Sequence, residues 1–164
     1  MTGHKQRHTK PEPDAELARL WSGVVSLFVE RRDAMFAVLG RHGLTPPHGH
    51  ALSMLGSGPA RMRDMAEHMA CDASYITAVV DRLEALGFAE RRASAADRRV
   101  KEIALTPAGQ RASDEIRATM MKPPDSFARL SSAERAILAE LMVKIVPDAD
   151  PSTDPFRPGP RRAA

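Results

Sequence analysis

Small polar side chains and arginines follow one another closely between positions 74 and 101 of this sequence. The small polar group is Ser74, Tyr75 and Thr77. A stretch of twenty residues then holds six basic side chains, namely Arg82, Arg91, Arg92, Arg98, Arg99 and Lys101. Hydroxyl groups can hydrogen-bond to base edges and phosphates, and clustered cations neutralise phosphate charge. The pattern therefore indicates contact with a nucleic acid.

The distribution of charge supports this interpretation more than the total does. The chain has 24 Lys and Arg against 21 Asp and Glu, a net charge of only +3. Six cations against Glu84, Glu90 and Asp97 give the stretch from 82 to 101 the same excess of three. The alternative is that these arginines only solvate an exposed hairpin. Aromatic residues make up 4% of the chain, which argues against stacking of single-stranded bases.

Other reactive side chains do not form a recognisable catalytic or metal site. Cys71 is the only cysteine, and such a residue is either a redox sensor or, more commonly, a small apolar side chain. His48 and His50 are two positions apart on a predicted helix and point in different directions, so they cannot chelate one ion. No nucleophile–base pair, phosphate loop or paired carboxylate stands out. We therefore predict neither an enzyme nor a bound cofactor or metal.

Composition also predicts the cellular compartment. A single cysteine suits a reducing environment, and no apolar run approaches the roughly 20 residues that span a bilayer. The first ten residues are polar and basic and do not resemble a secretory signal. These features predict a cytoplasmic protein without membrane contact.

Helix signals dominate the middle of the chain. The predicted helices run from about Asp14 to Arg41, Pro46 to Gly56, about Asp64 to Ala70, Asp72 to Gly87, Pro107 to Pro123, and from the capping box Ser131/Glu134 through Ile145. Between the fourth and fifth helices the apolar period shortens, which predicts strands over Phe88–Arg92 and Val100–Leu105. Two short helices, a longer one and then a hairpin predict a mainly α fold, a winged helix-turn-helix with flanking helices and one small β-hairpin wing.

The two ends of the chain differ from this compact unit, which covers residues 14–146. Residues 1–13 are predicted to form a flexible basic arm, and residues 147–164 a disordered proline-rich tail. Within the compact unit, the first and last helices carry more apolar surface than a lone winged helix can cover. The side chains concerned are Leu17, Leu20, Val24, Ile137, Leu138, Leu141 and Ile145. This excess predicts a second chain packed against them.

Five segments together resemble the MarR family of winged-helix regulators. They are Gly43–Pro47, Met62–Met69, Asp81–Phe88, Asp97–Arg99 and Leu105–Gly109. The resemblance implies a homodimer, with dimerisation helices at about 14–42 and 107–146 and a DNA-binding lobe at about 44–106. It places Ser74, Tyr75 and Thr77 at base edges or phosphates. It places Arg99 in the minor groove, with its guanidinium held by Asp97. Ala78 stands where many relatives carry an arginine.

The resemblance and the residues together predict a transcription regulator. We expect a homodimeric repressor that binds an inverted repeat of double-stranded DNA and is released by a small-molecule effector. The predicted DNA-binding residues are Ser74, Tyr75, Thr77, Arg82, Arg92, Asp97, Arg98 and Arg99. The alternative is a winged-helix module that binds another protein and has no affinity for DNA. Five methionines (35, 54, 62, 65 and 69) either line an effector pocket or fill the core.

Overall fold

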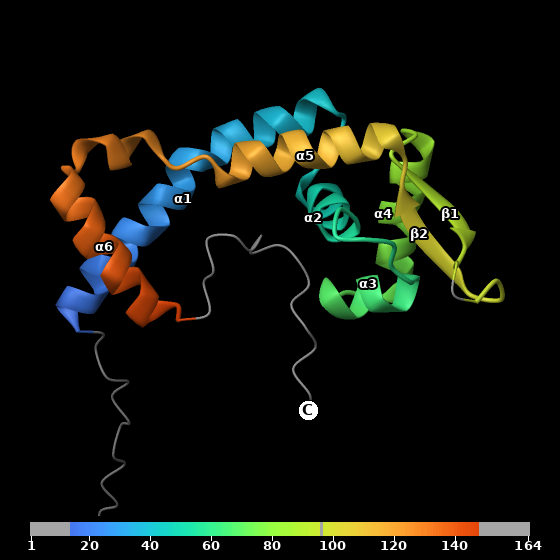
Figure 1. Cartoon of the computed structure of the whole chain (residues 1–164), viewed down its shortest axis with the longest axis horizontal. Helices are drawn as coiled ribbons and strands as arrows, with labels where there is room; N and C mark the ends of the chain where they lie inside the picture. Colours follow the sequence, from blue (N-terminus) through green and yellow to red (C-terminus); the bar gives the residue numbers. More distant parts are fainter. Residues whose placement is uncertain (1–13, 96, 148–164) are drawn as a thin grey trace, which may run out of the picture.

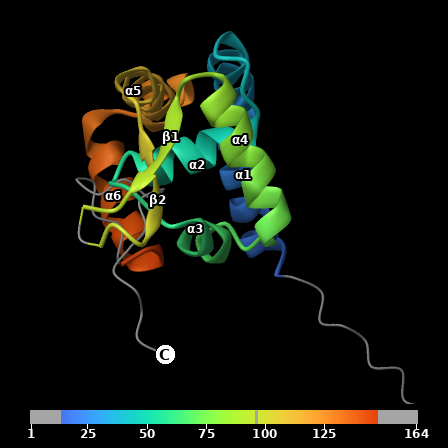
Figure 2. The same ribbon diagram turned by 90° about the vertical axis from the view of Figure 1, so that its right-hand side faces the viewer.

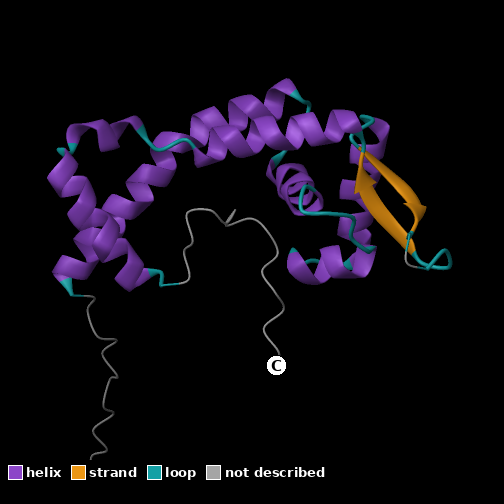
Figure 3. Ribbon diagram, in the orientation of Figure 1, coloured by secondary structure: helices purple, strands orange, loops and turns teal. Residues whose placement is uncertain are grey.

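The computed structural model describes residues 14–95 and 97–147. The predicted basic arm (1–13) and residues 148–164 of the predicted tail lie outside these residues. The described part contains six α-helices, one short 3₁₀ helix and one two-stranded sheet (Figure 3). The elements are α1 (Ala15–Arg41), α2 (Pro46–Leu55), α3 (Met62–His68), α4 (Ala73–Ala85), β1 (Ala89–Ala93), β2 (Lys101–Leu105), α5 (Pro107–Met121), η1 (Asp125–Arg129) and α6 (Ser132–Ile145). The prediction of a mainly α winged helix-turn-helix is confirmed.

Helices α1 and α5 lie side by side and join two different ends of the molecule (Figure 1). At one end α2, α3, α4 and the hairpin form a compact lobe, and at the other end α6 lies near the start of α1. Polar contacts fasten the pair: Arg41 donates to the Glu115 carboxylate at 2.5 Å, and the His42 ring lies 2.9 Å from its second oxygen. The hydrogen bond from Arg41, and to a lesser extent the one with His42, holds the pKa of Glu115 below its usual value.

The hydrophobic core belongs to the winged-helix lobe and to the parts of α1 and α5 that touch it. An apolar stripe on α4 is buried, with Ile76, Val79, Val80 and Leu83 all at most 4% exposed. It packs with buried side chains from the other elements, namely Val38, Leu39, Leu52, Met65, Ile103 and Ile116. The five methionines also lie in this core or pack against it, so core filling is the interpretation that the packing supports.

The hairpin follows α4 directly, and its second strand also pairs with a residue outside the hairpin. β1 and β2 are antiparallel, with Ala89 opposite Leu105 and Ala93 opposite Lys101. On its other side β2 is bridged by Ala60, which exchanges two backbone hydrogen bonds of 3.0 and 2.8 Å with Ile103. β2 is therefore paired on both sides, whereas β1 forms the outer edge of the sheet.

The joint between the hairpin and α5 explains the segment Leu105–Gly109. Thr106 caps α5 by accepting the Gly109 N–H at 3.0 Å, and its hydroxyl donates to the Gly87 carbonyl at 2.6 Å. A Cβ atom on Gly109 would lie 1.8 Å from the Phe88 carbonyl oxygen. Only glycine therefore permits this close approach of α5 to the end of α4.

Two local predictions differ from the structure. α3 begins at Met62 rather than at about Asp64, because Asp64 lies in the first turn, where a carboxylate favours the positive end of the helix dipole. The 3₁₀ helix Asp125–Arg129 was not predicted, since a single turn leaves no periodic apolar pattern. The capping box of α6 is confirmed, with the Ser131 N–H donating to Glu134 at 2.8 Å.

The end formed by α1 and α6 leaves large apolar side chains exposed. Phe28 and Ile145 are each 72% exposed, and Trp21 is 66% exposed. No residue of α6 is buried. Further exposed members of the two faces are Leu17, Leu20, Val25, Val29, Ile137, Leu141, Met142 and Val143, whereas Leu138 is half-buried. We call these two faces the α1/α6 apolar surface.

Candidate nucleic-acid interface

The first turn of α4 presents small polar groups in a fixed arrangement. Asp72 caps the helix by accepting the Tyr75 N–H at 2.7 Å, and the Ser74 hydroxyl donates to the same carboxylate at 2.6 Å. These bonds hold the pKa of Asp72 below its usual value, and the bond from the Ser74 side chain has the larger effect. Ser74 and Tyr75 themselves are exposed. The cap therefore orders the helix start while the side chains that follow it remain accessible.

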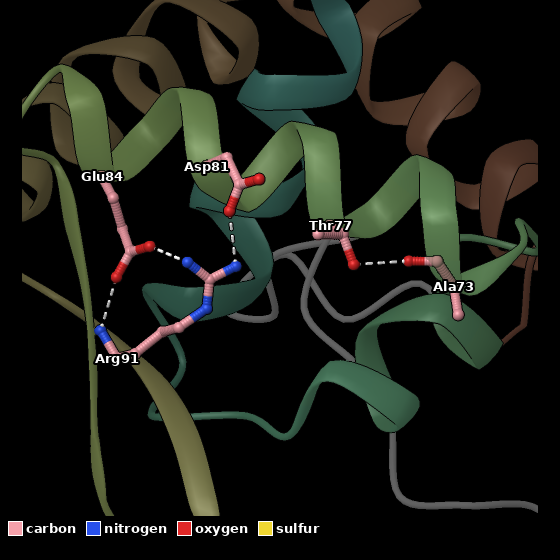
Figure 4. Close-up of polar contacts among 5 residues, drawn as sticks. All are labelled: Ala73, Thr77, Asp81, Glu84 and Arg91. Carbon is pink, nitrogen blue, oxygen red and sulfur yellow. Dashed lines mark hydrogen bonds and ion pairs between the residues drawn. The ribbon is translucent and has the colours of Figure 1, made fainter.

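The exposed face of α4 continues from this turn toward its C-terminal end. Thr77 is exposed, and its hydroxyl donates to the Ala73 carbonyl at 2.7 Å (Figure 4). The Thr77 oxygen keeps its acceptor capacity, because the bond to Ala73 uses only the hydroxyl hydrogen. Asp81 and Glu84 project from the same side of the helix (Figure 4). The buried stripe on the opposite side fixes which face of α4 is offered to a partner.

The wing turns back beside this helix. β1 follows α4 and runs back along it, so the hairpin tip and the first turn of α4 lie toward the same end of the lobe (Figures 1 and 2). Within the tip, the Ser94 N–H donates to the Val100 carbonyl at 2.8 Å and the Val100 N–H to the Asp97 carbonyl at 2.9 Å. The structure thus brings the predicted polar turn of α4 and the predicted wing tip to one side of the molecule.

Asp97 has a different partner from the one expected. Its carboxylate accepts the backbone N–H of Arg99 at 3.0 Å, and the expected bond to the Arg99 guanidinium is absent from the described contacts. The reason is local: an aspartate readily bonds the backbone N–H two residues on, which closes a tight turn. The side chains of Arg98 and Arg99 form no ion pair with any residue in 14–95 or 97–147. Both arginines are exposed.

Two other predicted arginines are engaged within the chain. Arg82 donates to the Gly43 carbonyl at 3.3 Å, which ties α4 to the turn between α1 and α2. Arg92 pairs with Glu102, directly across the hairpin, with an Nε–Oε1 distance of 3.2 Å. Each guanidinium carries five N–H donors, so one such contact leaves others available to a second partner.

Comparison with known proteins identifies this arrangement. Residues 42–100, which include α2, α3, α4 and β1, match the sequence model of the MarR family. In this segment the chain is similar to the MarR family. It is 34% identical over 105 residues to a putative transcriptional regulatory protein for the hcr operon of Thauera aromatica, a match that spans 63% of this chain and 63% of that protein.

Two solved structures share the fold of this chain. YusO from Bacillus subtilis superposes with a TM-score of 0.66 and 24% identity, over 85% of this chain and 100% of that one. The MepR–DNA complex from S. aureus superposes with a TM-score of 0.54 and 18% identity, over 80% of this chain and 99% of the other. At these identities the likeness concerns the fold.

Within the winged-helix lobe, three residues form a contact that was not predicted from the sequence. Arg91 was counted with the basic cluster, yet its side chain pairs with both Asp81 and Glu84 (Figure 4). The available signal was the spacing of the two acids, because residues three apart share a helix face. The strand that carries Arg91 lies against that face only in the folded protein, so its side of the contact was not visible in the sequence.

The remaining candidates belong to no assembled site. Cys71 is partly buried and lines an open groove of about 680 Å³ between α3 and α4, together with Met62, Ala66 and Ile76. Among residues 14–95 and 97–147, no three His, Cys, Asp or Glu side chains gather closely enough to hold a metal ion. None of the helices in this described part of the chain is long and apolar enough to cross a bilayer.

Proposed function

We propose that this protein is a transcription regulator that binds double-stranded DNA through α4 and the wing. The observation that carries the proposal is the pairing of two exposed features at one end of the lobe. One is the capped first turn of α4, with Ser74 and Tyr75 exposed, and the other is the wing tip, whose Arg98 and Arg99 form no described ion pair. Helix and wing insertion into adjacent grooves requires this combination.

Each predicted residue has a role in this proposal. Ser74, Tyr75 and Thr77 contact base edges or nearby phosphates in the major groove. Arg99 enters the minor groove, and Asp97 shapes the tip by holding the Arg99 backbone rather than its guanidinium. Arg82, Arg92 and Arg98 contact phosphates. Ala78 offers no hydrogen-bond donor, so shape and the minor-groove flanks carry more of the specificity than guanine contacts.

The functional unit of the proposal is a homodimer. The α1/α6 apolar surface supports it, because so many large apolar side chains at one end of a molecule are rarely left in water. A two-fold axis relating two lobes sends two α4 helices into successive major grooves, about 10 base pairs apart. The operator is then an imperfect inverted repeat of roughly 16–20 base pairs.

The proposal includes repression and release by a small-molecule effector. A dimer seated across such a site excludes other proteins from that stretch of DNA, which is sufficient for repression. Release by an effector rests on the resemblance to the MarR family. The role in transcription is supported by the T. aromatica relative, which is named as a transcriptional regulatory protein. Regulators of this family are transcription factors and not enzymes, so no reaction is assigned.

The second candidate is a winged-helix module that binds another protein and not DNA. It leaves the exposed arginine pair at the wing tip without a purpose, whereas DNA binding uses Arg98 at a phosphate and Arg99 in the minor groove. We therefore favour the DNA-binding function.

A gel-shift experiment distinguishes the two candidates. The probe is a duplex from the DNA immediately upstream of this protein's own gene, with a shuffled duplex of equal composition as the control. Two further probe series carry changes at the central half-site bases or at the flanks where the wings land. The proposal predicts a shift of the upstream duplex but not of the shuffled one, and a loss of affinity in both series of altered probes. Equal binding to the shuffled duplex would contradict specific recognition, and losses confined to half-site guanines would contradict the role given to the wing.

A further inference from the structure

Arg91 differs from the other wing arginines because its interactions are satisfied by α4. Its Nη2 lies 2.7 Å from the Asp81 carboxylate, and its Nη1 pairs with Glu84. The backbone N–H of Arg91 also donates to the Glu84 carboxylate at 2.9 Å. Two carboxylates of one helix therefore hold both the side chain and the backbone of a single strand residue (Figure 4).

The backbone contact closes the free edge of the hairpin. β2 is paired with β1 on one side and with Ala60 on the other, whereas β1 has only one strand neighbour. An edge strand leaves N–H groups that need another acceptor. Glu84 supplies that acceptor at Arg91, so the strand is fastened to α4 at its midpoint. The angle between the wing and α4 is thereby fixed by polar contacts as well as by packing.

The side-chain contact also controls charge on the exposed face of α4. Thr77, Asp81 and Glu84 are spaced four and three residues apart, which places them on one side of the helix. The Asp81 side chain is 58% exposed. Without a cation between them, the two carboxylates would present a double negative charge beside the residue that we expect to contact DNA. Arg91 lies between them and offsets part of that charge.

We infer that Arg91 is a positioning residue for the wing, which sets the wing against α4 and masks Asp81 and Glu84 without contacting DNA itself. The inference rests on the proposed function for its effect on affinity. A surface arginine in a basic cluster would ordinarily be assigned to a phosphate. Here the two acids occupy its guanidinium, and its neighbours Arg92, Arg98 and Arg99 remain for contacts with DNA.

A double-mutant cycle tests the assignment. Operator affinity is measured at one salt concentration for the wild type, Arg91→Gln, the pair Asp81→Asn with Glu84→Gln, and all three changes together. We expect Arg91→Gln to weaken binding about tenfold in the wild type but less than about threefold in the neutralised background, because contacting residues are energetically coupled. An equal loss in both backgrounds would overturn the inference, since a phosphate contact does not depend on the acids. Arg92→Gln is the matched control, with equal losses expected in both backgrounds.

A second measurement needs no DNA. Amide hydrogen exchange reports the bond between the Arg91 N–H and Glu84. Glu84→Ala should accelerate exchange at Arg91 by about tenfold or more, while the Ile103 amide, bonded to Ala60 at 2.8 Å, stays protected and shows that the fold is intact. Unchanged exchange at Arg91 would overturn the inference. If the wild type bound no DNA, the proposed function would fail, and the exchange result would still decide whether Glu84 fixes the wing.

Discussion

The winged-helix lobe buries its apolar side chains, whereas the α1/α6 end leaves many of them exposed. In the lobe, α4 buries its whole apolar stripe and exposes hydroxyls and charged groups. At the other end, α6 buries no residue and Phe28 of α1 is 72% exposed. The lobe therefore covers its apolar side chains within one chain, whereas we propose that a second copy covers those of the α1/α6 end. The difference separates two tasks, recognition and assembly, that substitutions can break one at a time.

The largest effect is expected from a charge placed on the α1/α6 apolar surface. Leu141→Asp should dissociate or unfold the dimer, because an unpaired carboxylate in an apolar interface costs on the order of several kcal/mol. Ser132→Asp adds the same charge at the first residue of the same helix, outside this surface and where a carboxylate is favourable, and should leave the dimer intact. Light scattering checks both variants, with about twice 17.9 kDa expected for the wild type and the control. A wild-type monomer that binds DNA would contradict the assembly role of this end.

A substitution at the wing should affect recognition without affecting assembly. Arg99→Ala is expected to weaken operator binding by roughly 1–3 kcal/mol, the usual range for an arginine at a groove, while the molar mass stays that of a dimer. Arg135→Ala, at the start of α6, removes another exposed arginine and should leave affinity unchanged. Fluorescence anisotropy in equal salt measures both. Unchanged affinity in Arg99→Ala would show that the wing does not enter the groove.

A smaller loss is expected from the recognition helix itself. Thr77→Val keeps the shape of the side chain and removes its oxygen, so operator affinity should fall by about 1 kcal/mol, the net value of one hydrogen bond. Thr119→Val is the matched control, because the Thr119 hydroxyl makes the same bond to the carbonyl four residues earlier, at 3.0 Å on α5. The two variants should have similar unfolding temperatures. Equal affinity in both would remove Thr77 from the contact set.

The smallest effect, a small change in stability, is expected at Glu115, which joins α5 to the end of α1. Its pKa is lowered by Arg41 and His42, so its contribution to folding is present at neutral pH and is lost as the pH falls below the usual value of about 4.3. Glu115→Gln should lower the unfolding temperature at pH 7 by less than about 4 °C. The difference between the two proteins should shrink as the solution is acidified below pH 4.3. A difference that stays constant with pH would show that Glu115 acts through packing.

The sequence predicted the elements of this fold wherever a local signal marks them. Ser131 caps a helix as expected, because a cap needs only neighbouring residues. The bridge between Ala60 and Ile103 was missed, since residues 43 positions apart meet only after the chain folds. Arg91 was missed as a partner of Asp81 and Glu84 for the same reason. Asp97 was assigned the right neighbour but the wrong atoms, because the backbone of Arg99 competes with its side chain.

Salt dependence of DNA binding tests the central claim most directly. The affinity of the wild type for its upstream duplex is measured by anisotropy across about 50–200 mM salt. If several arginines on each subunit neutralise phosphates, the log–log slope should lie on the order of −6 to −10 for the dimer. A slope shallower than about −2 would contradict recognition of DNA by α4 and the wing, and would favour a module that binds another protein.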